Sequence, residues 1–143
     1  MRFLVMGKAT EQTEAGVPPD EKAWADMAKF NEELIKAGVM LAAEGLLPTS
    51  KGARVKISGS KRTVVDGPFT EAKEVVAGFS IWQVRSKEEA LEWVKRCPNP
   101  SGRDTEIEIR QIMEATDFPE HYQPGMKERR ERLAAQLEGQ KKA

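Results

Sequence analysis

The segment at residues 65–74 constrains the fold more than any other, because it places a sharp turn between two β-rich runs. It contains Asp66-Gly67-Pro68-Phe69, and both Asp-Gly and Gly-Pro are dipeptides that mark turns. The flanking residues at 61–65 and 75–84 are rich in side chains that favour strands. The segment therefore predicts a sheet in which the chain reverses at this point, with acidic side chains at the rim of the sheet.

The rest of the chain alternates β-like and helical segments. The patterns of apolar and polar residues predict strands at 2–7, 39–47, 75–84 and 105–113, a hairpin at 54–58 and 61–65, and a polar loop at 8–19. Helical spacing of apolar residues predicts a helix that begins near Asp20 and ends at Gly38. Ser86 and Glu89 have the spacing of a capping box, which predicts a second helix that reaches Cys97.

This order of elements defines the expected fold class. Strand, helix, strand, hairpin, strand, helix and strand match an α+β, ferredoxin-like βαββαβ plan with an inserted hairpin. In that plan both helices cover one face of an antiparallel sheet. The first strand carries apolar side chains on both of its faces (Phe3, Leu4, Val5 and Met6). Because no helix is left to cover the second face, we expect two copies to pack sheet against sheet as a homodimer.

The chain changes character near its C-terminus. We expect one domain at residues 1–118 and a charged, helical extension at residues 119–143, which begins with proline and glycine interruptions. The apolar seam of the extension consists of Met126, Leu133, Ala134 and Leu137. That seam is too thin to hold a lone helix in water, so the helix is expected to dock on the domain or a partner, or to fray.

Composition excludes several classes of function. The sequence has 23 basic and 23 acidic residues, so it lacks the basic footprint of a nucleic-acid-binding protein. No apolar run approaches the roughly 20 residues that span a bilayer, and the first residues lack the pattern of a signal peptide. The single cysteine favours a reducing, cytoplasmic location. With one histidine and no glycine-rich phosphate loop, we expect no metal and no cofactor.

Asp66 and Glu44 are the candidate catalytic residues. Asp66 is interpreted either as a general base at the mouth of a pocket or as a side chain that fixes the Asp-Gly-Pro turn. Glu44 follows the apolar run at residues 39–43, where a carboxylate is costly unless it is paired, faces a pocket or already lies in water. If Glu44 and Glu71 face one cavity, their repulsion would raise one pKa and make an acid/base pair.

Other residues are candidates for ligand binding. Lys8 and Arg54 lie near strand ends and could bind an anion, although such charges are usually solvated. Glu71 and Trp82 are assigned to the wall of the same pocket, with the core as the alternative place for the tryptophan. Lys73 is interpreted as part of a surface charge cluster.

His121 and Cys97 have less specific interpretations. His121, next to Tyr122, would be a proton shuttle if the C-terminal extension folded over the pocket of the partner subunit; otherwise it is a solvated side chain. Cys97 lies on the apolar side of the second predicted helix, which favours a core position over a nucleophile.

Several of these motifs together resemble one known family, the DGPF proteins of the YCII-related family. The resemblance covers about residues 1–118 and rests on Asp66-Gly67-Pro68-Phe69 with Glu71, Lys73 and Glu74, on Gly78-Phe79, on Ala43-Glu44-Gly45-Leu46, and on Glu106-Ile107-Glu108-Ile109-Arg110. It implies a dimeric α+β barrel. YCII-like relatives pair a histidine with an aspartate in a cleft, but here the first predicted helix and the following strand contain no histidine, and His121 lies outside the resembling region.

Two functional hypotheses follow. The resemblance implies a cofactor-free enzyme for a small molecule, acting by proton transfer, isomerisation or an elimination such as the dehydrochlorination performed by one relative on a chlorinated hydroxyquinol. The alternative is a non-catalytic module that binds a small ligand or a regulatory protein. Proteins of this family tend to be encoded beside extracytoplasmic-function sigma factors, which implies a link to stress responses.

Overall fold

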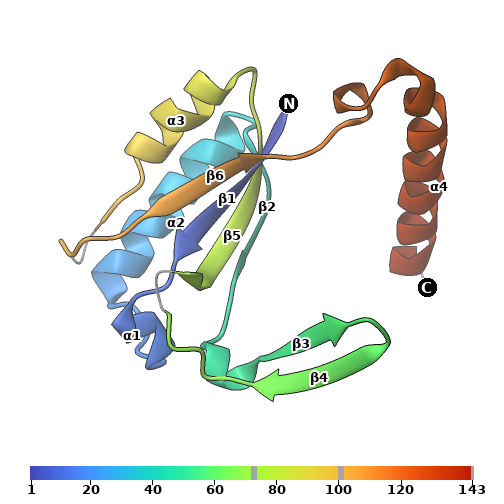
Figure 1. Ribbon diagram of the computed structural model, residues 1–143. Coiled ribbons are helices and arrows are strands. Elements are labelled where there is room, and N and C mark those ends of the chain that lie inside the picture. Colours follow the sequence, from blue (N-terminus) through green and yellow to red (C-terminus); the bar gives the residue numbers. More distant parts are fainter. Residues whose placement is uncertain (72–73, 100–101, 143) are drawn as a thin grey trace. The chain divides into compact units, whose positions relative to one another are not determined.

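The computed structural model describes residues 1–71, 74–99 and 102–142. The chain forms two compact units, Met1–Gln111 and Ile112–Ala143 (Figure 1). The first unit contains the main sheet, three helices and the hairpin. The second contains two short 3₁₀ turns and the C-terminal helix.

The main sheet has four strands in the order β2-β5-β1-β6, with every neighbouring pair antiparallel. The strands are β1 (Arg2–Lys8), β2 (Met40–Gly45), β5 (Val76–Gln83) and β6 (Ile107–Gln111). With α2 (Glu21–Lys36) after β1 and α3 (Lys87–Lys95) after β5, the chain has the ferredoxin-like βαββαβ topology. The predicted fold class is confirmed, and the predicted strand ends are within two residues of those observed.

Helices α2 and α3 cover the same face of the sheet (Figure 1). The strand period of two explains why that face is apolar, since Phe3 and Val5 of β1 alternate inward beside Trp82 of β5. These side chains pack against Phe30 and Leu34 of α2 in the hydrophobic core. Leu34 is fully buried, as expected for a residue at the centre of the apolar stripe of an amphipathic helix.

Both long helices of this unit begin at side-chain caps. The Asp20 carboxylate accepts a hydrogen bond from the Ala23 N–H at 2.8 Å, and the Ser86 hydroxyl accepts one from the Glu89 N–H at 3.1 Å. Helix α2 ends as predicted before Gly38, whose φ of 71° is readily adopted only by glycine.

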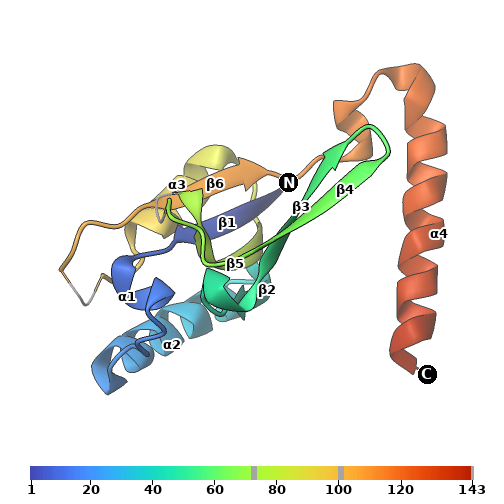
Figure 2. The same ribbon diagram turned by 60° about the horizontal axis from the view of Figure 1, so that its bottom comes forward.

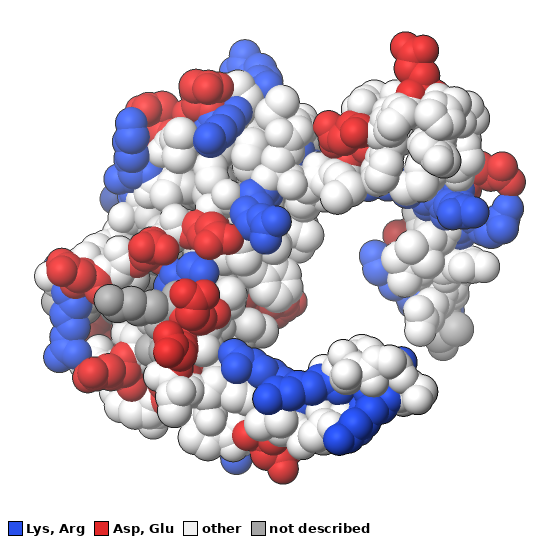
Figure 3. Space-filling view, in the orientation of Figure 1, with Lys and Arg blue, Asp and Glu red and all other residues white. Residues whose placement is uncertain are grey.

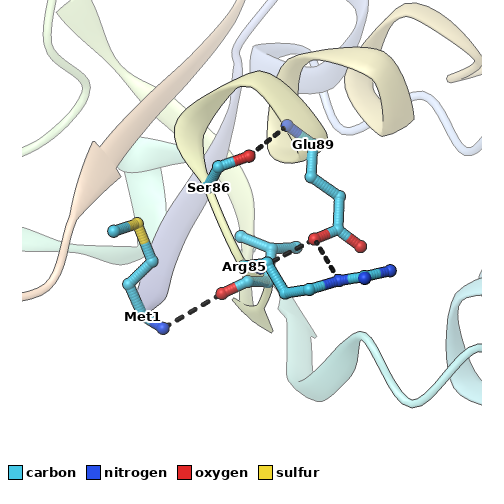
Figure 4. A network of polar contacts seen from close by, with 5 residues as sticks. Met1, Arg85, Ser86 and Glu89 are labelled. Carbon is cyan, nitrogen blue, oxygen red and sulfur yellow. Dashed lines mark hydrogen bonds and ion pairs between the residues drawn. The ribbon is translucent and has the colours of Figure 1, made fainter.

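The predicted capping box of α3 is only half right. The Glu89 carboxylate accepts the N–H of Arg85 at 2.7 Å, one residue before the serine whose N–H a capping box would use (Figure 4). The N-terminal ammonium of Met1 donates to the Val84 carbonyl at 3.0 Å. The start of β1 is thereby fixed next to the turn from β5 into α3.

The segment predicted as a loop at residues 8–19 contains one short helix, α1 (Glu11–Glu14). The Thr10 hydroxyl accepts the Thr13 N–H, and the Thr13 hydroxyl accepts the Thr10 N–H. This reciprocal capping box satisfies two backbone donors of a helix that is a single turn long. The prediction failed because threonine at the second position is a weaker sequence signal than glutamate.

The predicted hairpin is present as a separate two-stranded sheet, β3 (Ala53–Ser58) and β4 (Lys61–Asp66). The turn uses Gly59 with a φ of 60°. Every residue of both strands is exposed. In both ribbon views the hairpin extends away from α2 and α3 (Figures 1 and 2).

The second unit ends in α4 (Gln123–Lys142), which confirms the predicted C-terminal helix. Its first turns are tied to the 3₁₀ turns before it (Ala115–Asp117 and Glu120–Tyr122). The Arg130 guanidinium pairs with the Glu114 carboxylate and also donates to the Met113 carbonyl. Within the described part of the chain, no helix has the length and apolar character needed to cross a membrane.

Candidate functional site

Three glycines lie side by side on neighbouring strands of the main sheet. Gly78 of β5 pairs with Gly7 of β1 on one side and with Gly45 of β2 on the other. The strand alternation places all three on the face covered by α2, because Val5 and Ser80, two residues away, lie on that face. The sheet beneath this end of α2 therefore has a floor without side chains.

A cavity of about 400 Å³ lies above this glycine floor, between the sheet and α2. That volume is in the range of small-molecule sites. Its walls come from β1, β2, β5 and β6, from one side of α2 and from the residues just after α3. The lining residues are Val5, Gly7, Met27, Phe30, Asn31, Met40, Ala43, Glu44, Gly45, Gly78, Phe79, Ser80, Trp82, Cys97 and Ile107.

The chemistry of the cavity wall is mostly apolar and uncharged. Among the described residues that line it, none is a lysine, arginine or histidine, and Glu44 is the one acidic residue. The neutral polar groups are the amide of Asn31, the hydroxyl of Ser80 and the thiol of Cys97. Such a wall suits a ligand without a formal charge, because a buried unpaired charge is costly.

Trp82 and Cys97 behave as neutral groups of this wall. Trp82 is almost fully buried and packs edge-on against Phe30, with ring centroids 6.4 Å apart. Its indole N–H has no acceptor among the described residues. Burial raises the pKa of the Cys97 thiol above its ordinary value, so the uncharged thiol is favoured. Cys97 lies two residues beyond the last residue of α3, rather than within the helix as predicted.

Glu44 contributes to the cavity from the edge of the sheet. It lies on the exposed strand β2, opposite Phe79. Because Ala43 pairs with Ser80 on the α2 face, alternation places the Glu44 side chain with Phe79 on the other face. The Glu44 carboxylate is therefore directed away from the apolar wall, and the backbone of this residue borders the cavity.

Asp66 is not among the residues that line this cavity. It is the last residue of β4, is exposed, and lies opposite Ala53. Its carboxylate has no hydrogen-bond partner among the residues that the structure describes. The structure does not bring Asp66 and Glu44 together in one cavity.

The residues after Asp66 are hydrogen-bonded to two earlier segments of the chain. We call the residues that join these three segments the DGPF clasp (Glu14, Thr49, Gly67 and Phe69). The Thr49 hydroxyl donates to the Glu14 carboxylate and accepts the Phe69 N–H at 3.0 Å. The Thr49 N–H also donates to Glu14, at 3.1 Å. A Cβ on Gly67 would lie 1.7 Å from the Thr49 carbonyl oxygen, so only glycine fits there.

The two candidate anion-binding residues have partners of their own. Lys8 forms an ion pair with Glu108 across the β1–β6 pair, with a distance of 3.3 Å between Nζ and the carboxylate. The Arg54 guanidinium stacks over the Phe69 ring, 3.8 Å from its centroid, and so supports the DGPF clasp.

The remaining candidates lie outside the cavity wall. Glu71 is exposed. Lys73, interpreted from the sequence as part of a surface charge cluster, lies outside the described residues. His121 belongs to the second unit and contacts the ring of Tyr122, with ring centroids 4.2 Å apart and ring planes inclined at 41°. In the described part of the chain, no group of three histidine, cysteine or acidic residues is placed to hold a metal ion.

The sequence contained part of the signal for this cavity. Gly78 and Ser80 are small residues inside a strand, which indicates that something approaches that face closely. The contributions of Gly7 and Gly45 could not be recognised, because their alignment with Gly78 depends on the pairing register of three strands. Asn31 and Met27 gave no signal that distinguished them from other residues of the helix.

The fold and the site define an α+β protein with a ferredoxin-like sheet and a ligand-sized cavity beneath its first long helix. The chain belongs to the YCII-related family, because the family model of the YCII-related domain matches residues 1–116. The family expected from the DGPF motif is therefore confirmed.

Two individual proteins are similar to this chain. An uncharacterized protein of Rhizobium meliloti is 29% identical over 93 residues, which are 65% of this chain and 75% of that protein. The solved structure of 5-chloro-2-hydroxyhydroquinone dehydrochlorinase from Burkholderia phenoliruptrix, in complex with 2,5-dihydroxybenzoquinone, covers 81% of this chain and 98% of its own. That pair has 17% sequence identity and a TM-score of 0.41.

Proposed function

We propose that this YCII-related protein binds a small, uncharged, largely apolar molecule in the cavity above Gly7, Gly45 and Gly78 and acts on it without a cofactor. The observation that carries the proposal is the floor of three aligned glycines, which leaves a partly open hollow of about 400 Å³ between the sheet and α2. A hollow of this volume with a mostly apolar lining is consistent with a role in binding.

The lining selects the class of ligand. Apolar side chains of Val5, Met27 and Phe30 would contact the body of the molecule, and Asn31 and Ser80 supply hydrogen-bonding groups for one or two oxygens. A carboxylate ligand would find no cation among the described lining residues. A phenol, a quinone or a cyclic ketone fits this wall better than the corresponding acid.

Glu44 is the proposed base. It is the one residue with a carboxylate among those that line the cavity. Because the strand alternation directs this carboxylate to the other face of the sheet, the enzyme candidate requires it to reach the ligand past the edge strand β2. There it would remove a proton from carbon, after which the proton returns at another position or a leaving group such as chloride departs from the neighbouring carbon. In this proposal Asp66 supports the fold of the DGPF turn or acts from the rim, and Trp82 is a ligand-binding group of the cavity wall. Lys8, Arg54 and Glu71 lie outside that wall, and a role of theirs in ligand binding would belong to a separate surface site.

A specific observation favours a second candidate function, a non-catalytic ligand-binding module. The strand alternation directs the Glu44 carboxylate to the face opposite α2, and Asp66 is outside the cavity wall. The cavity would then bind and release a ligand without chemistry, as in a regulatory protein linked to a sigma-factor stress response. The two candidates share the binding site and differ in the role of Glu44.

Binding is tested by titrating two molecules of similar shape, neutral benzamide and anionic benzoate, while backbone amide signals are followed by NMR. We expect benzamide to shift the amides of residues that line the cavity and to bind at least about tenfold more tightly than benzoate. Gly7→Leu should abolish these shifts, since a Cβ on Gly7 has no atom within 4 Å and the side chain would project from the floor into the space that the ligand needs. Gly139→Leu in α4 is the matched control. Equal binding of both molecules, or binding unchanged by Gly7→Leu, would contradict the proposed site.

Catalysis is tested separately, by chloride release from chlorinated hydroquinones and by deuterium uptake from D₂O into cyclic ketones. The enzyme candidate predicts activity that Glu44→Gln abolishes while the binding of benzamide persists. Asp66→Asn shows whether the second carboxylate contributes. Binding without any turnover, unchanged in Glu44→Gln, would select the non-catalytic module.

We further propose that the protein functions as a homodimer. The face of the main sheet opposite α2 and α3 has an apolar centre formed by Leu4, Met6, Phe79 and Ile81. Charged residues flank this centre, with Glu44 on β2 at one side and the Lys8–Glu108 pair at the other. A self-complementary face of this kind suits an isologous contact between two copies. We also propose that the protein is cytoplasmic, as expected from its single cysteine, Cys97.

A further inference from the structure

We propose that the β3–β4 hairpin is an arm that docks on a second copy of this chain. The inference rests on the homodimer proposed above and goes beyond it, because it assigns a role to a segment outside the main sheet. We call residues 51–66 the arm, and residues 1–50 and 67–111 the body.

One face of the arm is apolar and exposed. Directly paired residues project on the same face of a hairpin, so the pairing of Val55 with Val64 and of Ile57 with Arg62 places the three apolar side chains together. Val55, Ile57 and Val64 are 55%, 67% and 65% exposed. A two-stranded hairpin is marginally stable in water by itself, so an arm with an uncovered apolar face calls for a partner surface.

The charge of the arm favours an acidic partner. The arm carries five basic residues and one acidic residue, namely Lys51, Arg54, Lys56, Lys61, Arg62 and Asp66. The basic side chains gather over the hairpin in the space-filling view (Figure 3). The body holds 16 acidic and 12 basic residues, so its net charge of −4 balances the +4 of the arm. A basic arm and an acidic body attract each other when they belong to two copies.

The direction of the arm places it where a second copy would be. The arm extends away from α2 and α3, which cover the closed face of the sheet (Figures 1 and 2). A second copy packed on the open face would lie on the side toward which the arm extends. The arm is thus continuous with the proposed dimer interface.

Hydrogen bonds and a cation–π contact fix the base of the arm to the body. An arm that docks at one defined site needs such a fixed base. The Gly67 N–H donates to the Gly52 carbonyl at 3.0 Å, which closes the base of the hairpin. Just beyond it, the DGPF clasp ties Phe69 to Thr49 and Glu14, and the Arg54 guanidinium stacks on the Phe69 ring. The DGPF motif would therefore aim the arm at the second copy.

The test uses heavy-isotope-labelled and unlabelled protein, mixed in denaturant, refolded together and treated with a carbodiimide that joins amines to carboxylates in contact. Mass spectrometry then shows whether a joined peptide pair comes from one copy or from two. We expect mixed-isotope pairs that join Lys56 or Lys61 to carboxylates of the body. A dimer in which these lysines are joined only to peptides of the same isotope would overturn the inference and leave the proposed dimer intact.

A second measurement uses variants that keep the strands. Val55→Thr, Ile57→Thr and Val64→Thr together remove the apolar face while keeping β-branched side chains. We expect this triple variant to weaken dimerisation at least about tenfold in sedimentation equilibrium. Val65→Thr, on the opposite face of the arm beside Arg54, is the control and should have little effect. Unchanged dimerisation of the triple variant would overturn the inference, whereas a monomeric wild-type protein would refute the proposed dimer itself.

Discussion

Gly7 and Gly78 lie directly opposite each other on neighbouring strands β1 and β5, both on the face covered by α2. Their surroundings differ although their positions match. A Cβ on Gly7 would have no atom within 4 Å, whereas a Cβ on Gly78 would lie 3.2 Å from the Glu44 carbonyl oxygen. Gly7 therefore borders open space, and Gly78 supports the close approach of β2. Together they explain why a cavity exists beneath α2.

This difference predicts opposite effects of the same substitution. Gly7→Ala should raise the free energy of unfolding by about 0.5–1 kcal/mol, because alanine restricts the unfolded chain and fits the folded one. Gly78→Ala should give no such gain and lower the stability by up to about 1 kcal/mol, since the neighbouring backbone must shift. Urea denaturation of both variants measures the two values. Equal effects would show that the cavity does not extend over Gly7.

The DGPF clasp predicts a strict requirement for glycine at position 67. Gly67→Ala should destabilise the protein by about 1–3 kcal/mol, because its Cβ would overlap the Thr49 carbonyl. Gly52→Ala is a matched control, since its Cβ would lie 3.6 Å from the same oxygen, an ordinary contact. Thermal and urea denaturation test both variants. A Gly67→Ala protein as stable as Gly52→Ala would contradict the close approach.

The hydroxyl of Thr49 has a separate, measurable role. Thr49→Val removes the acceptor of the Phe69 N–H and one donor to Glu14, which should cost about 1–3 kcal/mol. The specific readout is hydrogen exchange of the Phe69 amide, which should become faster. Thr49→Ser keeps the hydroxyl and should restore slow exchange. If Phe69 exchanges in Thr49→Val as it does in the wild type, this hydrogen bond is not formed in solution.

Cys97 predicts a dependence of stability on pH. Burial raises the pKa of its thiol above the ordinary value of 9.0, so the folded state holds this proton more tightly than the unfolded state. The resulting stabilisation is complete below that value and is lost as the pH rises through the folded pKa. Between about pH 7.5 and about pH 10, the wild type should therefore lose more stability than Cys97→Ala, as measured by urea denaturation. Parallel losses in the two proteins would contradict burial of the thiol.

The open sheet face predicts how the dimer can be broken. Ile81→Glu places a charge at the apolar centre of that face, where burial against a second copy is costly, and should give a species with the 16.0 kDa mass of one chain in sedimentation equilibrium. Gln83→Glu, on the same strand and face but opposite Arg2 at the end of the strand, is the control and should remain dimeric. A wild-type protein of 16.0 kDa at micromolar concentration would refute the dimer without any variant.

The sequence predicted those parts of the fold that depend on local signals. The apolar alternation of the strands, the helix start near Asp20, the Ser86 cap and the positive φ of Gly38 each involve residues a few positions apart, and each was recognised. Helix α1 was missed because a single turn has no apolar period, and its threonine box is a weak signal. The fold class followed from the order of strands and helices along the chain alone.

The candidate site could be predicted only in part, because its features depend on contacts between distant segments. Thr49 and Glu14 are separated by 35 positions, and nothing near either residue indicated that they meet. The sequence placed carboxylates at a pocket, whereas Glu44 is the one acidic residue of the described cavity lining and its carboxylate lies on the other face of the sheet. The neutrality of the wall depends on which residues of four strands share one face, which is a property of register.

The most direct test of the proposed cavity is a crystal structure of the protein with bound benzamide. The account predicts electron density for the molecule between α2 and the sheet, over Gly7, Gly45 and Gly78, with its amide near Asn31 or Ser80. Density at another place, or side chains of α2 closed onto the three glycines with no space for a ligand, would contradict it.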